Sequence, residues 1–176
     1  MNTKVIIAGF GGQGILFAGN LLANLSMIDG KEVTFFPSYG AEMRGGTCNC
    51  GVVISDTQIT SPVVNQPDYL IAMNKPSLNK FLPAVKKGGM VFVNKSLIDE
   101  VKVIEDISVH MIDANKIAEK IGDVRVANIV MLGYFIKLTK LINFDAVIES
   151  IKKVLSATKK SILDINIEAF RSGYEY

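Results

Sequence analysis

The sequence of 176 residues has two cysteines, one histidine and no tryptophan, and these scarcities exclude several kinds of site. Cys48 and Cys50 cannot build a disulfide scaffold, which indicates a reducing compartment such as the cytosol. A four-cysteine zinc or iron–sulfur site needs two more thiolates than the chain has. The two cysteines are two positions apart on an expected strand and so point to the same face, and we expect them to be buried small residues. With His110 as the single histidine, no nucleophilic triad is apparent. We expect no metal site and no catalytic residue in this chain alone.

Charge is scarce in the first 74 residues, which hold eight of the chain's 36 charged side chains (19 basic and 17 acidic). The net charge of +2 is too small for a protein that binds a nucleic-acid backbone. The uncharged stretch Val5–Ile28 is no membrane span, because glycines divide it into parts too short to cross ~30 Å of hydrocarbon. Two explanations of the uncharged half stay open. Either the chain's own helices cover a central sheet, or another subunit covers part of this half.

Strands alternate with helices along much of the chain. Short apolar runs predict strands at Lys4–Ala8, Lys31–Phe36, Thr47–Ser55, Tyr69–Met73, Met90–Asn94 and Val109–Ile112, with Pro37 ending the second strand. Helices are predicted at Ile15–Ile28, Ser77–Val85, Asp113–Gly122, Val126–Ile142, Phe144–Leu155 and Ser161–Arg171, with Asp113 as a cap and Gly173 as the last stop. This alternation predicts one α/β domain over residues 1–176, with a three-layer, mostly parallel sheet and a helical C-terminal part.

A glycine turn lies between the first expected strand and the first expected helix. Its residues that we expect to face a ligand or a partner are Gly9, Gly11, Gly12, Gln13 and Gly14. The G-x-G-x-x-G pattern in this context is that of a dinucleotide site, where amides at a helix N-terminus face an anion. Such a site also needs an acid at the C-terminal end of the second strand, and Glu32 stands at the other end. Three interpretations stay open: a closely packed turn, a surface for a partner or a shared ligand, and a stand-alone NAD(P)- or FAD-dependent enzyme.

A second glycine-rich loop follows the second expected strand, at the sheet edge where open α/β folds bind ligands. Its residues that we expect to face a ligand or a partner are Ser38, Tyr39, Gly40, Glu42, Arg44, Gly45 and Gly46. Glu42 and Arg44 are the only charged residues between Glu32 and Asp56. An arginine in apolar surroundings is either paired or available to an anion. Arg44 therefore either forms a local bridge with Glu42 or contacts a partner subunit or its bound substrate.

The segments VIIAGFGGQGILFAGNLLA and FPSYGAEMRGGTCNCGVVIS resemble the gamma subunits of 2-oxoacid:ferredoxin (or other acceptor) oxidoreductases. The resemblance extends along nearly the whole chain, through Asp68, the N-x-x-x-x-G spacing of Asn128 and Gly133, and the closing Ala169–Tyr174. The run Glu42–Gly46 is most similar to the separately encoded gamma chains of 2-oxoglutarate enzymes.

The resemblance implies a Rossmann-like domain docked beside an active centre that other subunits build. In such complexes thiamine diphosphate, with Mg²⁺, lies between the alpha and beta subunits, and iron–sulfur clusters lie in beta or in a ferredoxin-like delta subunit. The implied reaction is oxidative decarboxylation of a 2-oxoacid, here 2-oxoglutarate, with coenzyme A to acyl-CoA, carbon dioxide and reduced ferredoxin or a related acceptor. The chain would bind none of these cofactors alone, would be inactive alone, and would cover or complete the active centre in the cytoplasm. Self-association stays open.

Overall fold

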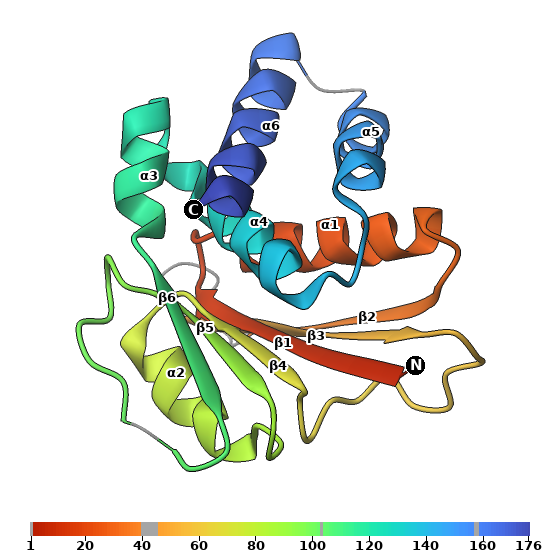
Figure 1. The fold of residues 1–176 in the computed structure, drawn as a ribbon, viewed down its shortest axis with the longest axis vertical. Coiled ribbons are helices and arrows are strands. Elements are labelled where there is room, and N and C mark those ends of the chain that lie inside the picture. The colour runs from red at the N-terminus through yellow and green to blue at the C-terminus, as the bar shows by residue number, and fades with distance from the viewer. Residues whose placement is uncertain (1, 40–45, 103, 157–158) are drawn as a thin grey trace.

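The chain folds around a six-stranded sheet with the strand order β2–β3–β1–β4–β5–β6 (Figure 1). The computed structural model describes residues 2–39, 46–102, 104–156 and 159–176. The strands are β1 (Asn2–Phe10), β2 (Glu32–Tyr39), β3 (Thr47–Ser55), β4 (Tyr69–Ala72), β5 (Met90–Asn94) and β6 (Ser108–Ile112). β1, β4, β5 and β6 pair in parallel, whereas β3 is antiparallel to both β1 and β2. The predicted α/β fold with a mostly parallel sheet is confirmed.

The direction of β3 follows from the length of the connection before it. Seven residues, 40–46, join β2 to β3, whereas a crossover to a parallel strand takes about a dozen residues or more. β2 is thereby the edge strand, and Pro37 lies inside it. The prediction that Pro37 ends this strand was wrong, because an edge strand tolerates a residue without an N–H on its open side.

Helices cover both faces of the sheet. The helices are α1 (Ile15–Ile28), α2 (Lys75–Phe81), α3 (Ala114–Ile121), α4 (Ala127–Thr139), α5 (Phe144–Val154) and α6 (Lys160–Glu175), with short 3₁₀ turns η1 (Leu82–Ala84) and η2 (Val124–Val126). α2 covers one face, and α1 and α4 cover the other. The C-terminal helices α5 and α6 pack on α1 and α4, outside the layer that covers the sheet (Figure 1).

The observed helix boundaries are close to the predicted ones, and the exceptions have local causes. α4 ends at Thr139, before the predicted Ile142, because Lys140 adopts a left-handed conformation (φ 52°) that closes the helix. Asp113 occupies the N-cap position of α3 as predicted, but its side chain makes no capping hydrogen bond. It lies instead 3.2 Å from the ammonium group of Lys116.

α1 is apolar around most of its circumference because it is packed on two sides. It lies between the sheet and the helices α4 and α5, and Leu21, Leu22 and Leu25 are fully buried. The chain's own helices therefore explain much of the uncharged N-terminal half. Phe17 and Phe36 nevertheless remain 40% and 49% exposed, so part of this half is open to another molecule. Within the described ranges, no helix has the length and hydropathy that crossing a bilayer requires.

Two glycines let α4 and α6 cross at very close range. A Cβ atom on Gly133 would collide with the carbonyl group of Phe170, and one on Gly173 would collide with that of Val130. Gly173 lies within α6, which continues to Glu175, so the prediction that it ends this helix was wrong. A glycine in a helix has a second use, because the missing side chain allows another backbone to approach.

Candidate functional site

The glycine turn lies at the carboxyl end of β1, where the strand order changes direction. The chain leaves β1 toward α1 and β2 on one side, while β4 lies on the other side, and ligands bind open α/β sheets at such a point. Gly12 and Gly14 have φ angles of 100° and 69°, in the left-handed region that favours glycine. Gly14 directly precedes α1, and no side chain of the described residues caps this helix. The first amides of α1 are thus available to an external acceptor.

The side chain of Gln13 holds the turn in place through hydrogen bonds within the protein. Its Oε1 atom accepts hydrogen bonds from the backbone N–H of Phe10 (2.7 Å) and from Nδ2 of Asn74 (2.9 Å). Its Nε2 atom donates to the carbonyl of Met73 at 3.5 Å. Asn74 is also the N-cap of α2, since its Oδ1 accepts from the N–H of Ser77. The Gln13 side chain therefore ties the turn to the end of β4 and to the start of α2.

Asn128, at the start of α4, fixes the same turn from the opposite face of the sheet. It is buried, and its Nδ2 atom donates to the carbonyl of Gly14 at 2.8 Å. A Cβ on Gly14 would collide with this amide group. The backbone N–H of Gly11 donates to the carbonyl of Gly46 at 2.9 Å, so the turn also contacts the end of the second glycine-rich loop. The glycine turn and Gly46, at the end of the second motif, are therefore neighbours in the fold.

These internal hydrogen bonds make the turn a poor dinucleotide site. The amides of Phe10, Gly11 and Gln13 already donate to protein oxygen atoms. Glu32 is the first residue of β2, as expected, and the C-terminal end of that strand carries no acid to bind ribose hydroxyls. The alternative of a stand-alone NAD(P)- or FAD-dependent enzyme is therefore not supported.

Of the residues predicted in the second loop, the structure describes Ser38, Tyr39 and Gly46. Ser38 is exposed and lines a hollow with Phe36 and Asn49 on the sheet face that α2 covers. Tyr39 is the last residue of β2. Gly40, Glu42, Arg44 and Gly45 lie outside the described residues, so their expected contact with a partner stays a prediction.

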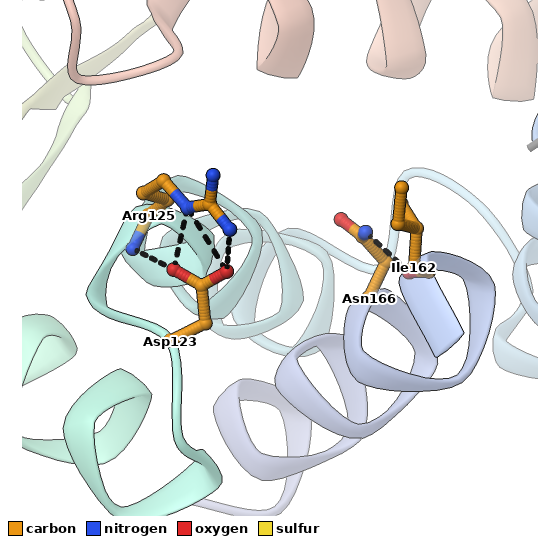
Figure 2. Close-up of polar contacts among 4 residues, drawn as sticks. All are labelled: Asp123, Arg125, Ile162 and Asn166. Atoms are coloured by element: carbon orange, nitrogen blue, oxygen red, sulfur yellow. Dashed lines mark hydrogen bonds and ion pairs between the residues drawn. The ribbon is translucent and has the colours of Figure 1, made fainter. Parts of the chain in front are cut away.

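A groove that the sequence analysis missed lies over the glycine turn; we call it the Arg125 groove. It has a volume of about 330 Å³ and is lined by Gly12, Gly14, Phe17, Asp123, Arg125, Val126, Asn128, Ile162, Ile165 and Asn166. Figure 2 shows Asp123 and Arg125 on one side and Ile162 and Asn166 on the other. The sequence signal for it is weak: an Asp-x-Arg triplet between Gly122 and α4 resembles an ordinary solvated turn.

Asp123 holds the Arg125 side chain in a bidentate ion pair (Figure 2). Nε of Arg125 donates to Oδ1 of Asp123 at 2.8 Å, and Nη2 donates to Oδ2 at 2.6 Å. Oδ1 also accepts from the backbone N–H of Arg125 at 2.9 Å. These hydrogen bonds lower the pKa of Asp123 and raise the pKa of Arg125. Both groups are therefore charged near neutral pH, and their charges offset one another at the groove.

The described residues do not offer the ligands of an iron–sulfur or zinc site. Cys48 and Cys50 are free and buried, as predicted, and burial raises the pKa of Cys50 to about 12. A protonated thiol is a poor cluster ligand, and a cluster needs four thiolates. Within the described ranges, no three His, Cys, Asp or Glu side chains lie together as a metal site would require. His110 stacks on Phe92 at 5.5 Å between ring centroids, and burial lowers its pKa.

Known proteins match the chain over nearly its full length. The family model for pyruvate ferredoxin/flavodoxin oxidoreductase matches residues 4–176. Ketoisovalerate oxidoreductase subunit VorA from Methanothermobacter marburgensis is 39% identical over 176 residues, which cover 98% of this chain and 36% of that protein. 2-Oxoglutarate synthase subunit KorC from Methanocaldococcus jannaschii is 37% identical over 178 residues, which cover 99% of this chain and 94% of that protein. The chain thus spans about a third of VorA and nearly all of KorC.

Solved structures have the same fold. The gamma subunit of keto/oxoacid ferredoxin oxidoreductase from Geobacter sulfurreducens superposes with a TM-score of 0.83 at 30% identity, covering 98% of this chain and 96% of that one. 2-Oxoglutarate:ferredoxin oxidoreductase from Magnetococcus marinus, solved with 2-oxoglutarate, coenzyme A and succinyl-CoA bound, has a TM-score of 0.89 at 23% identity. That match covers 99% of this chain and 30% of the longer one, and its low identity indicates a shared fold.

Proposed function

Because this chain belongs to the pyruvate ferredoxin/flavodoxin oxidoreductase family, we propose that it is the gamma subunit of a multi-subunit 2-oxoacid:acceptor oxidoreductase. The observation that carries this function is the match of residues 4–176 to the family, together with the full-length similarity to a gamma subunit of known structure. The complex would decarboxylate a 2-oxoacid oxidatively with coenzyme A, and would yield acyl-CoA, carbon dioxide and reduced ferredoxin or a related acceptor.

The chain's role would be to cover or complete an active centre that its partners build. Thiamine diphosphate, Mg²⁺ and the iron–sulfur clusters would reside in the alpha and beta subunits and in a ferredoxin-like delta subunit where one is present. The chain would be inactive alone and would work in the cytoplasm, where its two thiols would remain reduced. Arg44, ordered by Glu42, would face the alpha subunit and an anionic cofactor or substrate group there. The contact between Gly11 and Gly46 supports this role, because it brings the end of this loop to the ligand-binding edge of the sheet.

The 2-oxoacid would be 2-oxoglutarate. The residues Glu42–Gly46 are most similar to gamma chains of 2-oxoglutarate enzymes, and the KorC subunit that matches this chain over 94% of its length carries that name. VorA, which is 39% identical to this chain, is named for ketoisovalerate. The two substrates differ in charge, since 2-oxoglutarate has a second carboxylate that a pocket must pair with a cation or with N–H donors.

Steady-state kinetics with each 2-oxoacid in turn measures this preference directly. The chain is co-expressed with the alpha and beta subunits, the complex is purified, and reduction of ferredoxin is followed with coenzyme A and 2-oxoglutarate, pyruvate or ketoisovalerate. We expect kcat/KM for 2-oxoglutarate to be about ten-fold or more above the kcat/KM values for pyruvate and ketoisovalerate. The reason is that charge-assisted hydrogen bonds to the second carboxylate contribute about 1.5–3 kcal/mol. A preference for ketoisovalerate or pyruvate would refute the assigned substrate, and no turnover with any 2-oxoacid would refute the function.

A further inference from the structure

Building on the proposed function, we propose that the Arg125 groove binds an extended, uncharged peptide segment of a partner subunit, with an apolar side chain seated beside the glycine turn. Three features of the groove are available to a bound molecule. They are a hydrogen-bond acceptor on α6, hydrogen-bond donors near the start of α1, and exposed apolar side chains on the rim.

The acceptor is the side chain of Asn166. This residue is 5% exposed, and its Nδ2 atom donates to the carbonyl of Ile162, one turn earlier, at 2.7 Å. Its Oδ1 atom has no hydrogen-bond partner among the described residues and is directed into the groove, away from Ile162 (Figure 2). An amide oxygen held in a largely buried side chain gains from a donor that a bound molecule supplies.

The donors lie on the opposite side. Asp123 occupies Nε and Nη2 of Arg125, which leaves Nη1 without a partner among the described residues. Gly12 and Gly14 bring the uncapped N-terminus of α1 to the same groove. A groove with donors on one side and an acceptor on the other matches a peptide group, which carries one N–H and one C=O.

A phosphate or a carboxylate matches this groove less well. The carboxylate of Asp123 offsets the charge of Arg125, and Oδ1 of Asn166 would place a second oxygen against an anion's own oxygen atoms. Desolvating an anion without a net positive charge to receive it is costly. The groove's chemistry therefore favours a neutral, amide-bearing occupant.

The rim of the groove favours a protein as the source of that amide. Phe17 and Ile162 line the groove and are 40% and 45% exposed, and Val124, beside Arg125, is 45% exposed. Clustered exposed apolar side chains indicate a protein contact surface. In VorA the region that matches this chain is 36% of a longer polypeptide, so in that relative other segments of the same chain are available to cover the corresponding surface.

The test compares binding with stability. The affinity of the purified full chain for the alpha–beta assembly is measured for wild type, for the rim variant Phe17→Ser/Ile162→Ser, and for Asn166→Leu. The control is Met27→Ser, which changes a residue that is 59% exposed near the other end of α1. We expect the rim variant to raise Kd about ten-fold or more, Asn166→Leu to raise it several-fold, and the control to match wild type. The Tm of the isolated rim variant should fall by no more than about 5 °C, because the replaced side chains are only partly buried, at 40% and 45% exposure.

Three results would overturn the inference. If the rim variant and Asn166→Leu bind the alpha–beta assembly as wild type does, and the complex turns over, the groove is not a docking site although the proposed function stands. If the rim variant assembles normally but raises KM for coenzyme A, a small amide-bearing molecule occupies the groove instead of a peptide. If the wild-type chain itself neither assembles nor supports turnover, the proposed function fails, and the groove assignment fails with it.

Discussion

Replacing Gly173 with alanine is expected to lower the free energy of unfolding by about 3 kcal/mol or more. The added Cβ would collide with the carbonyl group of Val130, which belongs to the α4 backbone and cannot rotate away as a side chain can. α4 and α6 would have to separate, which would loosen the packing of the buried Phe135 and Phe170. For a domain of this size about 3 kcal/mol corresponds to a Tm lower by about 6–12 °C, which thermal unfolding by circular dichroism detects.

The matched control for this prediction lies one residue away. Ser172 is half-buried beside the crossing, and Ser172→Ala adds no volume there because it only removes the hydroxyl group, so it should change Tm by no more than about 2 °C. Gly133→Ala should destabilise as Gly173→Ala does, since its Cβ would meet the carbonyl of Phe170. A Gly173→Ala protein within about 1 kcal/mol of wild type would mean that the two helices do not cross as closely as the structure has them.

Replacing Arg44 with alanine is expected to lower kcat/KM of the assembled complex about ten- to hundred-fold. The proposed role has Arg44 facing an anionic group in the active centre, and charge-assisted hydrogen bonds contribute about 1.5–3 kcal/mol. The Tm of the isolated chain should change by no more than about 3 °C, because the lost contact is made to another subunit or its ligand. The measurement pairs initial rates of ferredoxin reduction by the complex with thermal unfolding of the chain alone.

Lys87→Ala is the control for lost positive charge, because Lys87 is 91% exposed and precedes β5, at the sheet edge opposite the glycine turn. It should leave both the rate and Tm at wild-type values. If Arg44→Ala lowers activity only as far as it lowers stability, Arg44 serves to order its own loop through Glu42, and the proposed contact with the active centre is wrong.

The order and type of the elements could be predicted because local patterns determine them. The apolar run Lys4–Ala8 forms the middle of β1, and the predicted helix Ile15–Ile28 matches α1 at both ends. What failed depended on contacts between distant segments. A proline such as Pro37 would end a central strand, but an edge strand tolerates it. A local sequence pattern does not show which strand will be at the edge of the sheet. From the sequence alone Gly173 is typical of a helix end, whereas in the fold it makes room for the backbone of Val130 in α4.

The candidate site was predicted only in part, for a similar reason. The glycine turn is recognisable from spacing, because its backbone conformation requires glycine at specific positions. The Arg125 groove combines the turn with residues that follow it by more than a hundred positions. In the sequence, Asp123 and Arg125 resemble a solvated pair, and Asn166 resembles any polar residue on an amphipathic helix. Only the fold places α6 across a groove from the turn. The sequence resemblance had marked Asn128, but its bond to Gly14 is visible only in the structure.

The most direct test of the central claim is an omission experiment. Turnover of 2-oxoglutarate with coenzyme A and ferredoxin is compared for the separated alpha–beta assembly, for this chain alone, and for the two recombined. If the chain is a gamma subunit, only the recombined sample should reach full activity, and the chain alone should show none above the buffer rate. Turnover by the chain alone, or an alpha–beta assembly that reaches full activity without it, would contradict the proposed role.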